Sequence, residues 1–112
     1  MIMVQWSCEV PPEKLESFLR FARETLKPFH ESHGCKRLEL FIPMEPQKKY
    51  FSYQVSQKRN RYTEQLIFDD LKDFENFLKA VEKDPHSKEI LESYDKEFSV
   101  SDCSFIILTQ EV

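Results

Sequence analysis

Residues 66–77, with the sequence LIFDDLKDFENF, join the end of an apolar strand to the start of an amphipathic helix. Leu66 and Phe68 fall on one face of the strand, which has the period of two typical of a sheet. Asp69 and Asp70 follow at once, and either can cap a helix because its carboxylate accepts a free N–H of the first turn. The apolar residues after them recur at helical spacing: Leu71, Phe74, Phe77, Leu78 and Val81. The stretch therefore predicts a strand that passes into a helix with almost no loop.

The first 42 residues predict a strand, a helix and a second strand. Residues 2–10 alternate between apolar and polar, which predicts a strand. Apolar residues recur three and four apart over residues 13–32, which predicts a helix whose last turn Pro28 kinks or tightens. Gly34, the only glycine in the chain, stands where a left-handed residue would close that helix. Residues 35–42 alternate again and predict the next strand.

The remaining residues continue with further strand-like and helix-like patterns. Residues 49–57 form a β-like run, and residues 58–61 suit a turn into a partner strand over residues 62–68. Pro85 suits the first turn of a new helix, on which one stripe would carry His86, Ile90, Tyr94 and Phe98. Residues 103–112 predict a last strand that is apolar on both faces.

The predicted order, β-α-β-(β)-β-α-α-β, indicates the α+β class. Right-handed crossovers place the helices on one face of an antiparallel sheet, which gives a ferredoxin-like split β-α-β fold. The 112 residues suit a single domain over residues 1–112. The free face of such a sheet should be polar, so the apolar residues on it predict a cover. A second copy of the chain is the simplest one, which predicts a homodimer.

Composition excludes several classes of function. The net charge of −4 and the short basic run at residues 58–61 do not suit nucleic acid, which attracts clustered Lys and Arg. No apolar run approaches the ~20 residues of a membrane span. The start of the chain lacks the pattern of a signal peptide, so we expect a cytoplasmic protein. Cys8, Cys35 and Cys103 are odd in number and in no CxxC spacing, so we interpret them as reduced, although one dithiol pair stays open.

Three short motifs, in this order, resemble those of the dimeric α+β barrel superfamily, in particular its antibiotic biosynthesis monooxygenase-like (ABM-like) branch. They are His33-Gly34-Cys35 with the strand at residues 38–41, Phe68-Asp69-Asp70-Leu71 with Phe74, and Pro85-His86. The resemblance implies a ferredoxin-like domain that pairs into a barrel. It also implies a choice among cofactor-independent monooxygenases of phenolic or quinol compounds, haem-degrading enzymes and members without known activity. Fold membership does not decide between these.

The chain departs from the family pattern at two positions. The family often carries Trp where this chain has Phe68, and His where it has Phe77. The stretch from Phe77 to His86 is also about one helical turn longer than usual. We therefore expect the chemistry to have moved to His86 or to have been lost.

His86 is the leading catalytic candidate, and Tyr94 is its partner. We expect both side chains to face the sheet, where a neutral imidazole can accept the proton of a phenol or ligate haem iron. The structural alternative for His86 is a hydrogen bond near Pro85 at the start of the helix. We expect the ligand pocket to be lined by aromatic side chains, for which plain core packing is the alternative: Trp6, Phe68, Phe74 and Phe77.

Other polar residues favour structural roles. His30 and His33 lie on the last turn of the first helix, where they suit its negative end. No third ligand stands at a recognisable spacing from them, so no metal site is predicted. A hydroxyl of Tyr62 could reach the same pocket as that of Tyr94, with a structural role favoured.

The hypothesis that follows is a homodimer that binds a small aromatic or apolar compound. The enzymatic form of it is cofactor-independent oxidation of a phenol or quinol, with His86 as the base. One alternative is haem binding or degradation with His86 as axial ligand. The other is a non-catalytic ligand-binding or interaction protein.

Overall fold

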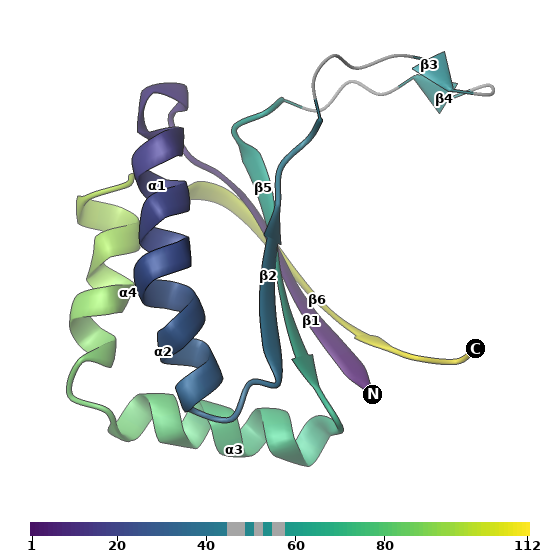
Figure 1. Cartoon of the computed structure of the whole chain (residues 1–112), viewed down its shortest axis with the longest axis vertical. Helices are drawn as coiled ribbons and strands as arrows, with labels where there is room; N and C mark the ends of the chain where they lie inside the picture. Colours follow the sequence, from purple (N-terminus) through teal and green to yellow (C-terminus); the bar gives the residue numbers. More distant parts are fainter. Residues whose placement is uncertain (45–48, 51–52, 55–57) are drawn as a thin grey trace.

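The computed structural model describes residues 1–44, 49–50, 53–54 and 58–112. Its main element is a four-stranded sheet in the order β2-β5-β1-β6, in which every neighbouring pair is antiparallel. The strands are β1 (Ile2–Glu9), β2 (Arg37–Phe41), β5 (Arg61–Phe68) and β6 (Ser101–Thr109). The two ends of the chain lie side by side in it, since Ile2 pairs with Thr109 (Figure 1). This order is that of the predicted ferredoxin-like fold.

The middle of the chain differs from the prediction of one strand over residues 49–57. The described residues there form two short strands, β3 (Lys49–Tyr50) and β4 (Tyr53–Gln54), which pair with each other and not with the main sheet. The predicted face also included Phe51 and Val55, which lie outside the described residues.

The first helical region spans residues 12–32 in four segments: η1 (Pro12–Lys14), α1 (Leu15–Phe21), η2 (Ala22–Leu26) and α2 (Lys27–Ser32). The η2 segment is a π-helix. It lies directly before Pro28, which has no N–H to donate to the preceding turn, and a wider turn relieves the clash of its ring. Gly34 then adopts a φ of 108°, and Cys35 donates its N–H to the carbonyl of His30 at 3.2 Å. The predicted left-handed close of the helix is confirmed.

The second helical region begins at the strand–helix junction of residues 66–77. Asp70 caps α3 (Leu71–Lys83), because its carboxylate accepts the N–H of Asp73 at 2.8 Å. Asp69 instead forms an exposed ion pair with Lys36 at 2.9 Å. A second helix, α4 (Ser87–Lys96), follows after a turn at Asp84.

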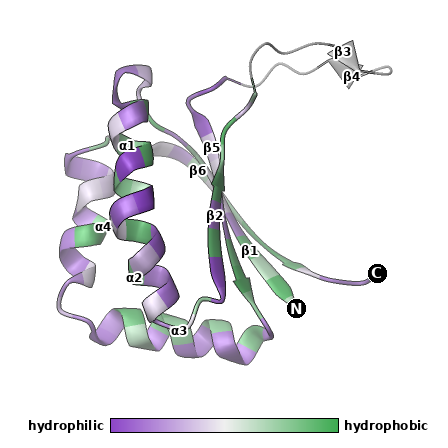
Figure 2. Cartoon of the chain, in the orientation of Figure 1, coloured by the Kyte–Doolittle hydropathy of each residue, from purple (hydrophilic) through white to green (hydrophobic). Residues whose placement is uncertain are grey.

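All helices lie on one face of the sheet (Figure 1). Their residues alternate between hydrophobic and hydrophilic, as Figure 2 shows, so each turns one side toward the strands. Two buried clusters fill the space between the layers. The first consists of Val4, Cys35, Leu38, Leu66, Phe68, Phe74 and Phe77. The second consists of Cys8, Val10, Phe18, Ala22, Leu26, Tyr62 and Phe98.

The two edge strands of the sheet, β2 and β6, differ in what covers them. At β2, Leu38 donates its N–H to Glu31 at 3.0 Å and accepts from Lys27 at 2.9 Å, so an ion pair on α2 occupies its outward backbone groups. At the opposite edge, every residue of β6 is exposed. Strand edges without a cover are sites of pairing with other chains.

A buried carboxyl group as the candidate functional site

Glu64 is a buried carboxyl group on the helix-facing side of β5. It is 3% exposed and lies among the apolar residues of that face, between Leu40 on β2 and Trp6 on β1 in the strand register. Burial disfavours the charged form of a carboxyl, and it raises the pKa of Glu64 to about 7. At neutral pH this group can therefore both release and accept a proton.

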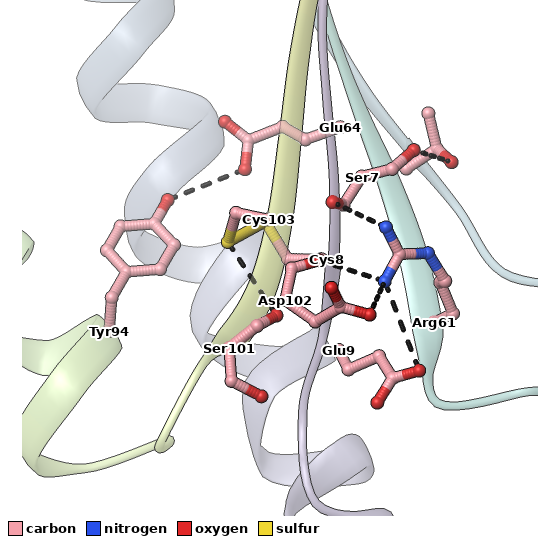
Figure 3. Close-up of a disulfide and its surroundings, with 10 residues drawn as sticks. Ser7, Cys8, Glu9, Arg61, Glu64, Tyr94, Ser101, Asp102 and Cys103 are labelled. Atoms are coloured by element: carbon pink, nitrogen blue, oxygen red, sulfur yellow. Dashed lines mark hydrogen bonds and ion pairs between the residues drawn. A yellow bond between two sulfur atoms is a disulfide. The ribbon is translucent and has the colours of Figure 1, made fainter.

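Tyr94 on α4 reaches the same carboxyl from the helical layer. Its hydroxyl donates to Oε2 of Glu64 at 3.4 Å, an interaction that opposes the effect of burial and lowers the pKa of Glu64 (Figure 3). Burial, and then the nearby charge of Glu64, raise the pKa of Tyr94 well above its ordinary value. Tyr94 therefore remains a hydrogen-bond donor throughout the physiological range.

His30 on α2 approaches the other oxygen of the carboxyl group. Its Nε2 lies 3.8 Å from Oε1 of Glu64, and its side chain is 13% exposed. Its Nδ1 is buried and has no hydrogen-bond partner among the residues that the structure describes. Burial, and then the charge of His33, lower the pKa of His30 to about 4. A buried polar atom without a partner is costly, so this nitrogen suits a polar atom of a ligand or of water.

His33 lies one turn later and has a structural role. Its Nε2 lies 2.8 Å from a carboxylate oxygen of Asp84, and its Nδ1 lies 2.6 Å from the carbonyl of Phe29. The hydroxyl of Ser32 also lies 3.0 Å from Nδ1. The pair of His33 and Asp84 ties the end of α2 to the turn between α3 and α4.

His86 lies away from Glu64, and the prediction that it faces the sheet is wrong. It precedes the first residue of α4 as the N-cap, and it is exposed. His86 does share a side of the helix with Ile90, because the N–H of Ile90 donates to its carbonyl at 3.2 Å and both line one groove, but His86 itself is exposed. His86 lines an open groove of about 500 Å³ between α2 and α4, together with Glu24, Glu89 and Glu97.

The predicted aromatic pocket residues are mostly packed against each other. Phe68, Phe74 and Phe77 belong to the first core cluster, with ring centroids of Phe68 5.2 Å from those of both others. Phe77 also contacts His30 edge-on at 5.4 Å. Trp6 is only partly buried and packs against Phe105 of β6 at 4.8 Å. Trp6 is thus the member of this set that lies beside Glu64.

A groove of about 320 Å³ lies between β2 and the first helical region. Its lining residues are Leu19, Ala22, Arg23, Lys27, Leu38, Leu40 and Ile42. Leu40, which lines the groove, pairs with Glu64 in the strand register. The π-helix contributes Ala22 and Arg23 to its wall. The volume is within the range of small-molecule sites.

The cysteines also differ from the prediction. Cys8 and Cys103 form a disulfide between β1 and β6, and Cys35 is the buried free thiol. The prediction of reduced cysteines is therefore wrong for two of the three. Spacing along the chain does not reveal the pair, because 95 residues separate its members and the sheet brings them together.

Sequence reasoning missed Glu64 and the position of His30, although a signal existed for each. Glu64 interrupts the alternating face of Tyr62, Leu66 and Phe68. His30 continues the four-residue spacing of Ala22 and Leu26 on the buried face of the first helix. A polar residue on an apolar face is the informative exception, because burial of an unpaired polar group is costly.

The groove beside His86 does not suit haem. It is lined by three carboxylates and by no Lys or Arg among the described residues, whereas haem carries two negative propionates. Among the residues that the structure describes, no group of three or more His, Cys, Asp or Glu side chains could hold a metal ion. No described helix has the length and apolar character needed to cross a membrane.

The chain is similar to known proteins in its structure, whereas comparison by sequence found no match. No family model matches the chain, and no curated protein matches it. Among solved structures, an uncharacterized NIPSNAP domain protein from Burkholderia xenovorans is similar with a TM-score of 0.73 and 13% identity, over 98% of this chain and 94% of that one.

Two further structures are similar over nearly their whole length. SnoaB from Streptomyces nogalater, described as a cofactor-independent oxygenase and solved as a mutant, gives a TM-score of 0.62 at 17% identity, over 99% of this chain and 93% of that one. A protein from Deinococcus radiodurans assigned as an antibiotic biosynthesis monooxygenase gives a TM-score of 0.65 at 9% identity, over 100% of this chain and 94% of that one. At such identities the likeness establishes the fold, and the activity has to be argued from residues. The chain has the ferredoxin-like α+β fold that these solved structures share.

Proposed function

We propose that this protein binds a small aromatic compound with an acidic hydroxyl group beside Glu64, and that Glu64 removes the proton of that hydroxyl. The buried carboxyl group with a pKa of about 7 carries this proposal. A general base is most effective when its pKa lies near the working pH. The role that the sequence suggested for His86 thus moves to Glu64, with Tyr94 retained as its partner.

The neighbours of Glu64 support this assignment. Tyr94 donates to the carboxylate and would hold it in place. The free Nδ1 of His30 would meet a second polar atom of the ligand. Trp6 would offer an aromatic face next to the carboxyl group, and the groove behind Leu40 would give access.

The reaction that we propose is oxygenation without a bound cofactor. Loss of a proton to Glu64 turns a phenol or quinol into an electron-rich anion that reacts with O₂. The substrate supplies all four electrons that O₂ takes up: one oxygen atom enters its ring, the other leaves as water after Glu64 returns the proton, and the product is a quinone. The description of SnoaB as a cofactor-independent oxygenase on the same fold favours this chemistry over haem-dependent chemistry. We also propose a cytoplasmic location. Lasting disulfides are rare there, so this location requires the Cys8–Cys103 bond to be reversible.

The test is oxygen uptake with a panel of phenols and quinols. Glu64→Gln keeps the shape of the side chain and removes its charge, so uptake should fall by about 100-fold or more. The rate in the wild type should rise with pH to a plateau above about pH 7, because the base must be ionised. Glu92→Gln, which removes an exposed carboxylate on α4, is the matched control.

Two results would overturn the proposal. Uptake lost in His86→Gln but kept in Glu64→Gln would return the role to His86. Absence of both uptake and binding across the panel would leave a non-catalytic protein. Binding can be followed through the fluorescence of Trp6, the only tryptophan, which lies beside Glu64.

We also propose that two copies associate through residues 105–108 of β6 and the free face beside them. Four consecutive apolar residues of β6 are 41–51% exposed: Phe105, Ile106, Ile107 and Leu108. Light scattering should give twice the chain mass of 13.5 kDa. Ile106→Glu should reduce this to a single chain, whereas Leu91→Glu, at an exposed position of α4, should not. A single-chain mass for the unaltered protein would refute the dimer.

A further inference from the structure

The Cys8–Cys103 disulfide joins a buried position to an exposed one. Cys8 is 3% exposed and belongs to the second core cluster, whereas Cys103 is exposed on the edge strand β6. Figure 3 places the bond on the sheet beside Glu64 and Tyr94. A small thiol in solution can therefore approach the sulfur of Cys103 and not that of Cys8.

The bond is located at an irregularity in the pairing of β1 with β6. Ser7 pairs with Ser104, but Glu9 pairs with Ser101, so two residues of β6 face the single residue Cys8. The extra residue is Asp102, whose φ of 51° is left-handed. This is a β-bulge, which shifts the register of every residue beyond it.

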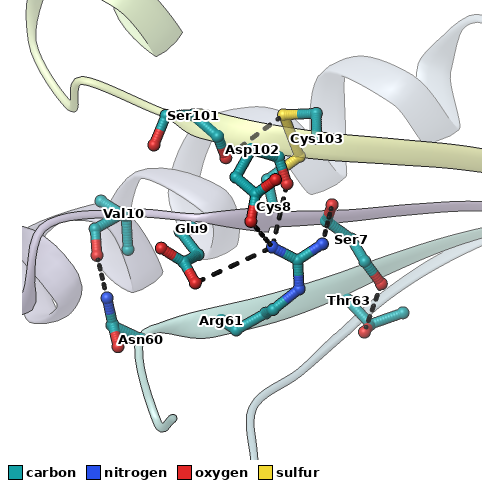
Figure 4. Close-up of polar contacts among 10 residues, drawn as sticks. All are labelled: Ser7, Cys8, Glu9, Val10, Asn60, Arg61, Thr63, Ser101, Asp102 and Cys103. Carbon is teal, nitrogen blue, oxygen red and sulfur yellow. Dashed lines mark hydrogen bonds and ion pairs between the residues drawn. A yellow bond between two sulfur atoms is a disulfide. The ribbon is translucent and has the colours of Figure 1, made fainter. Parts of the chain in front are cut away.

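Arg61 holds the same bulge through polar contacts. Its guanidinium donates to the carbonyl and the carboxylate of Asp102 at 2.9 and 3.0 Å, and to the carbonyl of Ser7 at 3.1 Å (Figure 4). The disulfide and Arg61 thus fix the bulge together, one by a covalent bond and the other by three hydrogen bonds.

The sequence of β6 does not fix its register by itself. Phe105 and Ile107 pair with Trp6 and Val4, while Ile106 and Leu108 pair with Gln5 and Met3 on the other face. A slip by one residue exchanges the two faces of a strand. In residues 105–108 the exchange replaces apolar side chains by apolar side chains, so hydrophobicity opposes it only weakly. The contacts at the bulge must therefore specify the register.

We propose that Cys8 and Cys103 form a reversible thiol–disulfide site whose oxidation state decides whether β6 keeps its bulged register on β1. A small thiol of the glutathione class would attack Sγ of Cys103 as its thiolate. The S–S bond breaks, Cys8 leaves and takes up a proton, and a mixed disulfide remains on Cys103. A second small thiol then attacks that mixed disulfide and releases Cys103. Two electrons pass to the protein, and the small thiols leave as their own disulfide.

After reduction, the hydrogen bonds of Arg61 would hold the bulge without the covalent bond. The amide hydrogens of β6 should then exchange with solvent more rapidly, because the strand opens or changes register more often. The emission of Trp6 should change as well, since its contact with Phe105 depends on the register.

The experiment equilibrates the whole chain in glutathione buffers of graded ratio and counts thiols by alkylation in denaturant. One thiol per chain, that of Cys35, is expected in oxidising buffer and three in reducing buffer, with a single midpoint. Hydrogen exchange over residues 101–109 should be at least tenfold faster in the reduced protein. Cys103→Ser, a change at an exposed position, should show the fast exchange in every buffer, while exchange in α3 stays unchanged.

Three outcomes would overturn the proposal. One is three thiols in oxidising buffer, which would mean that the bond does not form. Another is a bond that glutathione reduces only after unfolding, which would make it a permanent structural link. The third is unchanged exchange in β6 after reduction and in Cys103→Ser. No substrate is involved, so the result is independent of the function proposed for Glu64.

Discussion

His30 and Glu64 form a buried pair of titratable groups that come from α2 and β5. Nε2 of the imidazole lies 3.8 Å from Oε1 of the carboxyl group, and both side chains are largely buried. Burial raises the pKa of Glu64 to about 7 and lowers that of His30 to about 4. Between these values the folded pair is a neutral acid beside a neutral imidazole. The unfolded chain in the same range carries a carboxylate and an imidazolium, which also hold one proton.

The stability of the wild-type protein should therefore depend little on this pair between about pH 4.5 and 6.5. Stability changes with pH only where the folded and unfolded states bind different numbers of protons. Glu64 alone would lower the free energy of unfolding as pH rises from about 4.5 to 7. His30 alone would raise it from about pH 4 to 6.5, so the two slopes cancel.

Substitution of either residue should reveal how the other makes the free energy of unfolding depend on pH. Glu64→Gln leaves His30, so the free energy of unfolding should rise by about 3 kcal/mol from pH 4 to 6.5. His30→Leu leaves Glu64, so it should fall by about 3 kcal/mol from pH 4.5 to 7. Urea unfolding at several pH values measures both. Parallel pH curves for the three proteins would show that the pair is not coupled in this way.

The adjacent residues Asp69 and Asp70 should differ in their effect on stability. Asp70→Ala removes the cap of α3 and should cost about 1 kcal/mol, because the N–H of Asp73 loses its acceptor. Asp69→Ala removes only an exposed ion pair with Lys36 and should leave stability unchanged. Thermal or urea unfolding of the two variants provides the comparison. Equal losses would mean that the cap is not specific to Asp70.

Phe77 should be essential for the core. It is 3% exposed and contacts Phe68, Phe74 and His30, so Phe77→Ala should cost about 3–5 kcal/mol through the cavity that it leaves. Leu78 follows it on α3 and is 46% exposed, so Leu78→Ala should cost less than about 1 kcal/mol. A small effect of Phe77→Ala in urea unfolding would instead favour a ligand pocket at this position.

Glu31 should protect the outward edge of β2. Glu31→Ala removes the acceptor of the Leu38 N–H, whose hydrogen should then exchange with solvent at least tenfold faster. Glu39→Ala changes a carboxylate of the same strand that pairs with Arg37, and it should leave the exchange of Leu38 unaltered. Hydrogen exchange followed by NMR resolves this single amide. Unchanged protection in Glu31→Ala would show that the ion pair does not cover the edge.

Local patterns were sufficient for the helices, the four strands of the main sheet and their order, but not for residues 49–57. The stripe from Leu71 to Val81, the aspartate cap before it and the left-handed Gly34 each depend on neighbours a few residues apart. The same patterns indicated the sheet topology, because crossovers of fixed hand leave few arrangements. The exposed start of α4 was beyond them, since spacing alone does not reveal that the helix begins after His86.

The main-sheet strands, the helices and the ferredoxin-like plan follow from the amino-acid sequence, because they depend on periodicity and on turn and cap residues. The burial of particular polar groups together depends instead on the packing of the layers. Glu64, His30 and Tyr94 come from three elements and meet only when α2 and α4 pack on β5, and Cys8 reaches Cys103 only through the pairing of β1 with β6. Burial and proximity, which set the pKa of Glu64 and the partner of each cysteine, are properties of the packed layers and not of any segment.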